Sequence, residues 1–333
     1  MPVGAVRATL PYAVGALAGY AADARFGDPG RGHPVAVFGR AAGRLERALW
    51  RDHRGAGALH TALCVGAVAA GAVGVERLAL ARTRGAAPVA TAAPVATAAL
   101  ATWTVLGGTS LTREARTIGA ALAADDLDAA RERLPHLCGR DPSALDGAQI
   151  ARAVVESVAE NTADAVVNAL VWGALAGPPG LLAFRAVNTL DAMVGHKSAK
   201  YRRFGWAAAR LDDLAGWPGA RLTALLTVAA APPAGRRTAW RVWRRDGSAH
   251  PSPNAGQAES AFAGALGVRL GGPLRYGVRV EQRPVLGAEL RPVGAGDIEV
   301  ACRLSRRVGL LALGTTVAAR FALAAARSRR GTI

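Results

Sequence analysis

The chain has 333 residues, of which 51% are apolar, 5% aromatic and 20% charged. The apolar content excludes an intrinsically disordered chain, and three widely spaced cysteines without a CxxC pair exclude a disulfide scaffold and favour small buried side chains. The net charge of +17 leaves two explanations open, either a compositional bias toward arginine or an affinity for anionic lipid, phosphorylated substrates or nucleic acid.

Apolar segments follow one another along the chain at residues 10–22, 59–75, 86–108, 165–184, 222–234 and 308–326. Crossing a bilayer takes about 20 apolar residues, which makes the uncharged segment at 86–108 the strongest candidate. A Gly-Pro-Pro-Gly sequence breaks the segment at 165–184, two prolines end the one at 222–234, and Arg320 interrupts the last. We therefore expect about four true spans, with the broken segments re-entrant or buried against protein.

The predicted fold class is mostly α, because apolar and polar residues rarely alternate as they do in strands. We expect a polytopic helical membrane protein with broken or re-entrant helices and cytoplasmic-side polar loops, forming a single domain over residues 1–333. Residues 125–133 predict a short charged surface helix. A large soluble protein with buried Ala-rich helices is the alternative. The arginines at 327–330 favour a cytoplasmic C-terminus, which is hard to combine with four spans.

The polar segments between the apolar ones carry the candidate functional residues. In the first, residues 27–35, prolines hold Asp28 and His33 on an extended or turn-like loop. Taken alone, this segment is better explained as an ordinary loop than as a functional site.

The second polar segment, residues 152–168, has a polar side chain at every fourth position: Arg152, Glu156, Glu160, Asp164 and Asn168. On a helix these residues form one slowly drifting stripe. Acids one turn apart repel each other by a few tenths of a kcal/mol, and a divalent cation would relieve that repulsion. Two explanations remain open: a Mg²⁺ site, or the solvated face of an amphipathic helix.

The third polar segment, residues 185–213, combines acids, an amide and cations. Asn188 and Asp191 share a helix face, and the segment ends at Asp212 and Asp213. It contains both lysines of the chain among many arginines. This favours a role there for the compact charge of an ammonium group rather than for the planar guanidinium group of arginine.

The fourth polar segment, residues 250–277, begins with His250, Ser252 and Asn254 separated by prolines, and continues through Glu259 to a Gly271-Gly272 pair. Backbone N–H groups of such a Gly-rich segment can bind an anion, but 40 glycines in the chain make this signal weak. The chain has no P-loop, GxSxG, HExxH or helix-turn-helix pattern, so nucleic-acid binding would rest on charge alone.

Together these segments resemble one known family. The sequences GDP and HPV (within 27–35), VVESVAENTADAVV (154–167), FRAVNTLDAMVGHKSAKYRRFGWAAARLDDLAGWPGARLTALL (184–226) and HPSPNAGQAESAFAGALGVRLGG (250–272) are similar, in the same order, to the CobD/CbiB family of cobalamin biosynthesis. Members of that family are adenosylcobinamide-phosphate synthases. This chain departs from the family's motifs at Ala165, Asn168, His196 and Ala258. The acidic, histidine and asparagine residues of those motifs are retained.

The resemblance implies a multi-pass protein of the cell (inner) membrane whose active site faces the cytoplasm. It implies an ATP-dependent acid–amine ligase that joins adenosylcobyric acid to (R)-1-amino-2-propanol O-phosphate, or to aminopropanol, giving adenosylcobinamide (phosphate). ATP and Mg²⁺ are the implied cofactors, and the adenosylated corrinoid is a substrate. Membrane lipid is a further partner and nucleic acid is not, while a homo-oligomer or an aminoalcohol-supplying protein stays open.

A mechanism that fits the chemistry and the resemblance activates the carboxylate as an acyl phosphate, which the amine then attacks. We assign metal or amine handling to Glu156, Glu160 and Asp164, with Mg²⁺ on Glu160, Asp164 and Asp191. His33 or His250 would accept the proton. Substrate and phosphate binding would fall to Asp28, Asn161, Asn188, Asp191, Lys197, Arg202, Arg203, Asp212, Asp213, Ser252, Asn254 and Glu259.

Two other functions compete with this hypothesis. A non-enzymatic corrinoid-handling scaffold or transporter would share the fold, and charged pairs within the membrane would favour it. A basic nucleic-acid binder would show steeply salt-dependent DNA binding.

Overall fold

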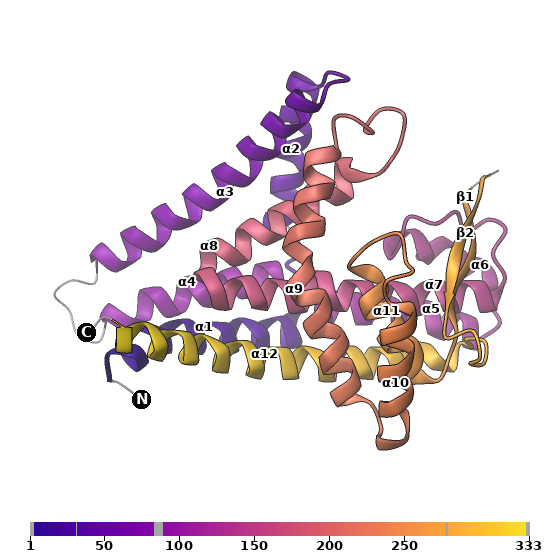
Figure 1. The fold of residues 1–333 in the computed structure, drawn as a ribbon. Coiled ribbons are helices and arrows are strands. Elements are labelled where there is room, and N and C mark those ends of the chain that lie inside the picture. The colour runs from indigo at the N-terminus through magenta and orange to yellow at the C-terminus, as the bar shows by residue number, and fades with distance from the viewer. Residues whose placement is uncertain (1–2, 31, 83–88, 277–278, 331–333) are drawn as a thin grey trace. The chain divides into compact units, whose positions relative to one another are not determined.

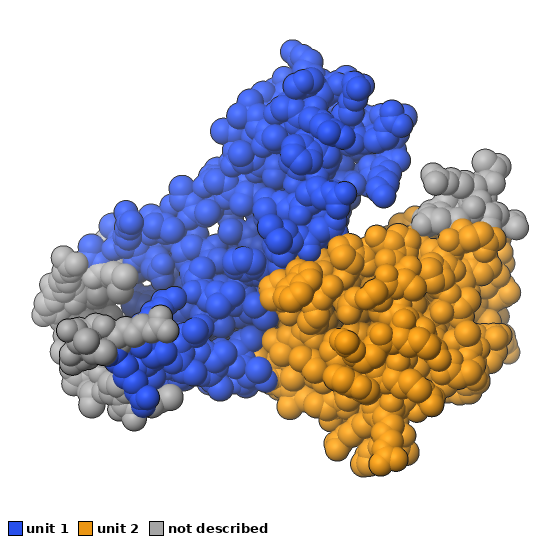
Figure 2. Space-filling view, in the orientation of Figure 1, with its two compact units in different colours: residues 1–107, 168–215, 313–333 blue, residues 108–167, 216–312 orange. Residues whose placement is uncertain are grey.

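The computed structural model describes residues 3–30, 32–82, 89–276 and 279–330, which are predominantly helical, as predicted (Figure 1). They divide into two compact units that are both discontinuous in sequence (Figure 2). Unit 1 comprises residues 1–107, 168–215 and 313–333, and unit 2 comprises residues 108–167 and 216–312. The chain passes between the units four times, so neither unit is a separate stretch of sequence.

Unit 1 contains α1 (Val3–Phe26), α2 (Pro34–Leu49), α3 (Arg54–Arg82), α4 (Val89–Val105), α8 (Asn168–Leu190) and the π-helical turn η3 (Asp191–Gly195). Helices α1 and α4 form its most extensive pair. Gly15 and Gly19, one turn apart on α1, lie directly against Ala98 and the backbone of Ala99 on α4, where any Cβ would overlap those atoms. This small-xxx-small pattern lets the two helix backbones approach closely.

Unit 2 contains α5 (Gly108–Ala123), α6 (Leu127–Arg133), the 3₁₀ turn η1 (Leu134–His136), α7 (Gly147–Thr162), the π-helical turn η2 (Ala163–Val167), α10 (Pro233–Asp246), α11 (Ala255–Leu266) and the strands β1 (Leu270–Tyr276) and β2 (Arg279–Leu286). Helix α6 is the short charged helix expected at 125–133. Helix α7 packs against α5, α11 and β1. The boundary between the units falls inside α9 (Trp206–Ala230) and α12 (Gly296–Arg330).

The antiparallel hairpin of β1 and β2 is an element that the sequence did not indicate. Leu270 pairs with Leu286, and the register shifts by a bulge between Gly271 and Pro273. Gly271 and Gly272 have φ of 76° and 82°, a conformation that glycine adopts without strain. The bulge and the glycines remove the regular alternation by which a strand is recognised in sequence.

Three stretches among the described residues are long and apolar enough to cross a membrane: Arg54–Ala79, Gly147–Gly195 and Gly296–Arg329. They include the predicted segments 59–75, 165–184 and 308–326. The segment 86–108 lies partly outside the described residues, and its described part belongs largely to the 17-residue α4. In the most apolar window of Gly147–Gly195, 67% of the residues are buried, against 17% in Arg54–Ala79 and 28% in Gly296–Arg329. This is expected for a broken segment packed against protein.

Arg320, which interrupts the apolar sequence of α12, is accommodated by the break in α8. Gly177 has φ 67° and ψ −160°, which ends the helical hydrogen bonding there and leaves carbonyls of the preceding turn without helical partners. Arg320 Nη1 donates to the carbonyls of Gly173 at 3.1 Å and Ala174 at 2.9 Å, and its guanidinium lies 4.2 Å from the ring centre of Tyr12. The charge is therefore balanced by backbone dipoles and an aromatic face.

Candidate functional site

The predicted site residues fall into two groups, one in each unit. Unit 2 contains Glu156, Glu160, Asn161, Asp164, His250, Ser252, Asn254 and Glu259, and unit 1 contains Asp28, His33, Asn188, Asp191, Lys197, Arg202, Arg203, Asp212 and Asp213. The group in unit 2 is centred on α7 and α11. The group in unit 1 is centred on η3 and the segment that follows it.

Glu156 is the most thoroughly bonded acid of unit 2. It is 3% exposed, its Oε2 forms an ion pair with Arg140, and its Oε1 accepts the backbone N–H of Gly271 at 2.6 Å. Arg152 Nε lies 3.9 Å from the same Oε1. Arg152 and Glu156, the first two residues of the stripe, thus form an interior contact, because the hairpin and Arg140 cover this face of α7. These bonds give Glu156 a structural role at the junction of α7 and β1.

Glu259 on α11 lies in the same acidic cluster and is also buried, with 5% of its side chain exposed. Burial raises its pKa well above the usual range, and the negative charges of Glu156 and Glu160 raise it further, against the lowering effect of Arg140 and Arg283. A carboxyl group in this setting favours its protonated form. Such a group can donate or exchange a proton, which is the property expected of an acid–base residue.

His250 faces Glu259, with its Nε2 4.0 Å from Glu259 Oε1. The backbone N–H of Ser252 donates to His250 Nδ1 at 3.0 Å, and Arg283 Nη1 lies 3.4 Å from His250 Nε2. Gly256 allows this arrangement, because a Cβ there would overlap His250 Cβ. His250 and Glu259, predicted from separate parts of one motif, therefore form a buried pair.

Ser252 and Asn254 are both engaged within the protein. Ser252 Oγ accepts the N–H of Asn254 at 3.3 Å and that of Ala255 at 3.1 Å, so it caps the start of α11. Asn254 is buried and its Oδ1 accepts a bond of 3.0 Å from Arg221. Their observed bonds position the loop before α11.

The stripe of four-residue spacing is divided by the π-helical turn η2. Glu156 and Glu160 lie one turn apart on α7, whereas Asp164 lies within η2, where the wider turn changes the direction of successive side chains. Glu160 is exposed, Asp164 half-buried and Asn168 buried, so the stripe is not one solvated face. Asn161 Nδ2 donates to the carbonyl of Ser157 at 2.9 Å.

In unit 1, Asp191 begins the second π-helical turn, η3. A Cβ on Gly195 would overlap the Asp191 carboxylate, so the absence of a side chain at Gly195 makes room for that group. Asp191 and Asp213 are close enough for their charges to interact. Asn188 Nδ2 donates to Asp212 Oδ1 at 3.4 Å. The acids and the amide of the third polar segment therefore gather at the end of α8.

The segment after η3 presents free cations and one anchored lysine. Lys197 and Arg202 are exposed, and their side chains have no hydrogen bond or ion pair with the described residues. Arg203 lies 3.6 Å from Asp52. Glu46 on α2 is buried and accepts bonds from Lys200 Nζ at 2.7 Å and Tyr201 Oη at 2.8 Å. We call these three residues, Glu46, Lys200 and Tyr201, the Glu46 clamp.

The first polar segment forms a cap. His33 Nδ1 accepts the N–H of Val35 at 3.1 Å and starts α2, with Pro34 as the first helical residue. His33 Nε2 lies 4.0 Å from Asp28 Oδ1. This geometry matches the ordinary-loop explanation and also holds the two side chains together.

The acids fit a magnesium ion only in part. Among the described residues no three His, Cys, Asp or Glu side chains are grouped closely enough to hold a metal. Glu160 and Asp164 belong to unit 2 and Asp191 to unit 1. Mg²⁺ commonly uses one or two carboxylates and completes its shell with phosphate oxygens and water, so Glu160 and Asp164 of unit 2 have suitable donor chemistry for a site completed by a nucleotide.

Several residues of these clusters were not among the predicted site residues: Arg140, Arg221, Arg283, Glu46, Lys200 and Tyr201. Their partners lie beyond the spacing of a single helix, 16 positions apart for Arg140 and Glu156 and 154 for Lys200 and Glu46. Local spacing carries no signal for such contacts.

Comparison with known proteins identifies relatives over most of the chain. The model of the family described as CobD/Cbib protein matches residues 16–305. A cobalamin biosynthesis protein CobD from Mycobacterium tuberculosis is 55% identical over 299 residues, covering 89% of this chain and 92% of the relative. Proteins of the same name from Geobacter metallireducens (44% identical, 82% and 86% covered) and Rhizobium meliloti (42% identical, 81% and 83% covered) are also similar. No solved structure matches the chain.

Proposed function

Because this chain belongs to the CobD/CbiB family, we propose that it catalyses the ATP-dependent joining of adenosylcobyric acid to aminopropanol or its O-phosphate. Its role in cobalamin biosynthesis follows from the family, and its membrane character agrees with the three long apolar helical stretches. The finer assignment of an amide ligase is our proposal. It rests on the motif resemblance and on the chemistry of the two residue groups.

The observation that carries the proposal is the buried pair of Glu259 and His250 beside Glu156 and Glu160. In the proposed reaction a carboxylate oxygen of the corrinoid attacks the terminal phosphorus of ATP, forming an acyl phosphate and releasing ADP. The amine nitrogen then attacks the acyl carbon, loses a proton and expels phosphate. An ammonium group must lose a proton before it can attack, so the reaction requires a nearby acid–base group.

The residues of unit 2 have suitable properties for the amine. Glu160 is exposed on α7 and supplies negative charge for an approaching ammonium group. Burial raises the pKa of Glu259, so the carboxyl holds its proton more tightly than an exposed glutamate and can exchange it with His250 in the proposed reaction. We propose His250 and Glu259 as the acid–base pair. Glu160 and Asp164 would hold Mg²⁺, which would supply charge neutralisation for the phosphates.

The residues of unit 1 suit phosphate binding. Lys197 and Arg202 follow the π-helical turn η3 and are free of protein partners among the described residues. Two free cations can stabilise charge on a transferring phosphoryl group. Arg203 is proposed to assist, and the Glu46 clamp orders the segment that carries all three.

Mass spectrometry of membranes containing the protein tests the proposal. The membranes are incubated with adenosylcobyric acid, Mg-ATP and either aminopropanol or its O-phosphate. We expect an ATP-dependent adduct with loss of water relative to the two substrates, and the productive amine identifies the preferred substrate. Absence of any adduct from folded, membrane-inserted protein would overturn the ligase proposal in favour of a non-enzymatic corrinoid-handling role.

A further inference from the structure

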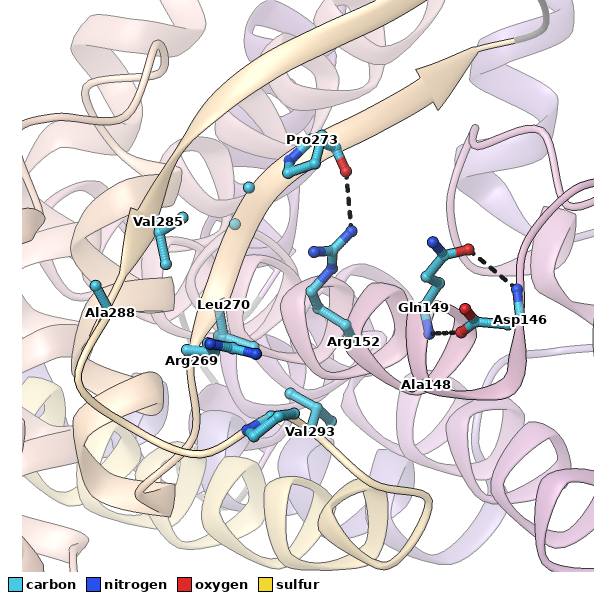
Figure 3. Close-up of a pocket in the computed structure, with 13 residues that line it drawn as sticks. Asp146, Ala148, Gln149, Arg152, Arg269, Leu270, Pro273, Val285, Ala288 and Val293 are labelled. Carbon is cyan, nitrogen blue, oxygen red and sulfur yellow. Dashed lines mark hydrogen bonds between the residues drawn. The ribbon is translucent and has the colours of Figure 1, made fainter.

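Unit 2 contains a pocket that is lined by none of the proposed catalytic residues. One wall residue, Gly271, is hydrogen-bonded to Glu156. The volume of the pocket is about 420 Å³, within the range of small-molecule sites. The N-terminal turns of α7, the start of β1 and the segment from Val285 to Val293 form its walls (Figure 3). The inference drawn from it stands apart from the proposed function.

Two arginines give the pocket its charge. Arg152 extends from α7 toward β1, and its Nη2 donates to the carbonyl of Pro273 at 3.0 Å (Figure 3). Its Nε is buried and has no hydrogen-bond partner among the described residues. Arg269, just before β1, is exposed, and its guanidinium makes no ion pair or hydrogen bond with the described residues. The pocket thus offers two cationic groups with unused donors.

No free carboxylate within the lining balances this charge. Among the described residues that line the pocket, Asp146 is the only acid, and its Oδ1 accepts the N–H of Gln149 at 2.8 Å. Gln149 Oε1 in turn accepts the N–H of Asp146 at 3.0 Å, completing a capping box at the start of α7. Glu156 Oε1 lies 3.9 Å from Arg152 Nε, but Glu156 is also bonded to Arg140 and Gly271, so its single charge is shared between two arginines. The pocket therefore has an excess of positive charge.

The remaining walls are apolar or without side chains. Leu270, Val285, Val293 and the neighbouring alanine and prolines contribute aliphatic surface. A Cβ at Gly272 would lie 3.4 Å from Arg152 Nη1, so the glycine keeps the space beside this guanidinium open. An occupant that matches the pocket has an anionic head of several oxygens and a short aliphatic body.

We propose that this pocket binds the phosphate group of a small phosphate ester. Arginine forks bind phosphate oxygens in pairs, and a phosphate with more than one negative charge matches two guanidinium groups better than a single carboxylate does. The ester can come from a soluble phosphomonoester or from the headgroup of an anionic lipid. Both present the same phosphate chemistry to Arg152 and Arg269.

Isothermal titration calorimetry tests the proposal. The purified full-length protein is held in phosphatidylcholine nanodiscs, and ATP and corrinoid are left out. The probes are inorganic phosphate and glycerol 3-phosphate, with phosphatidate-containing nanodiscs as the lipid arm. We expect saturable binding that Arg269→Met weakens at least about tenfold, because a charge-assisted contact is lost. Arg237→Met, at an exposed arginine on α10 outside the pocket, is the matched control and should bind as the wild type does.

A second variant separates charge from shape. Val285→Trp fills the pocket from the half-exposed strand β2 without changing its charge, and we expect a similar loss of binding. Thermal unfolding of each variant verifies the fold. If the soluble phosphate probes bind and compete with one another for the pocket, the occupant is a soluble phosphomonoester. If the two variants weaken binding only of phosphatidate in the nanodiscs, the occupant is a lipid headgroup. Absence of binding by every phosphate probe, or binding indifferent to both variants, would overturn the proposal while leaving the ligase proposal untouched.

Discussion

Glu156 on α7 accepts the backbone N–H of Gly271 at 2.6 Å, across 115 positions of the sequence. This bond joins the acidic stripe of the second polar segment to the Gly-Gly pair of the fourth. The Gly-rich backbone does bind an anion here, and that anion is a carboxylate of the protein itself. The junction of α7 and β1 is therefore fixed by a buried charge, which makes its stability sensitive to that charge.

We expect Glu156→Gln to lower the free energy of unfolding by about 3 kcal/mol, because it removes the buried negative charge that balances Arg140. The Arg140 and Glu156 side chains are 10% and 4% exposed, so water screens this pair little. Thermal unfolding in detergent micelles measures the change. Glu132→Gln, at an exposed acid on α6, should leave the unfolding temperature within error of the wild type. Equal stability of the two variants would contradict a structural role for Glu156.

Glu259 should make stability depend on pH in a defined direction. Burial raises the pKa of Glu259 in the folded protein above its ordinary value of 4.5, with the charges of Glu156 and Glu160 adding to the shift. The folded state therefore binds this proton more tightly than the unfolded state does. Its contribution to stability is complete below the unfolded pKa and is lost as pH rises through the folded pKa.

Glu259→Gln tests this dependence, since glutamine keeps the shape of the protonated acid and cannot ionise. We expect the unfolding temperature of the wild type to fall, relative to that of the variant, as pH rises from about 4.5 through the raised pKa of Glu259. Glu289→Gln is the contrasting control, because hydrogen bonding to Arg245 lowers the pKa of exposed Glu289. Parallel pH curves for the wild type and Glu259→Gln would show that Glu259 does not change protonation in this range.

The Glu46 clamp should order the segment that carries Lys197 and Arg202. Burial alone would raise the pKa of Glu46, but the bonds from Lys200 and Tyr201 and the Lys200 charge outweigh it and lower the pKa. We expect Glu46→Ala to increase hydrogen exchange of backbone amides in residues 196–205 by at least tenfold, which corresponds to about 1.4 kcal/mol of local stability. Tyr201→Phe removes one of the two bonds and should give a smaller increase.

Because the folded pKa of Glu46 is lowered, the clamp should be intact above the unfolded value of 4.5 and weaken as pH falls through the folded pKa. Exchange in residues 196–205 measured at several pH values, corrected for intrinsic rates, tests this direction. Unchanged protection in Glu46→Ala would mean that the clamp does not order the segment.

Under the proposed function, Glu160→Gln should reduce turnover by about 10²- to 10⁴-fold, because it removes the exposed charge assigned to the amine and Mg²⁺. Glu160 is exposed on α7, so its replacement should not impair expression or membrane insertion. Adduct formation followed by mass spectrometry, normalised to folded protein, measures the effect. Near-wild-type turnover would remove Glu160 from the site, whereas Glu132→Gln should retain full activity.

Local sequence was sufficient for the helical class, the short helix α6, the break in α8 and three apolar stretches long enough to span a membrane. These features follow from apolar runs, charge and the conformational limits of glycine and proline, all of which act over a few residues. The hairpin of β1 and β2 was missed because a bulge and two glycines hide its alternation. The two π-helical turns were missed because a single inserted residue per turn leaves no compositional trace.

The sequence by itself determined the family, the residue types of the candidate site and their division into four polar segments. Only the tertiary structure decided which of these side chains meet. It paired His250 with Glu259, bound Glu156 to Arg140 and Gly271, and anchored Lys200 on Glu46. The physical reason is that burial and charge balance depend on groups far apart in the chain, and these set both the pKa of Glu259 and the excess positive charge of the pocket beside Arg152 and Arg269.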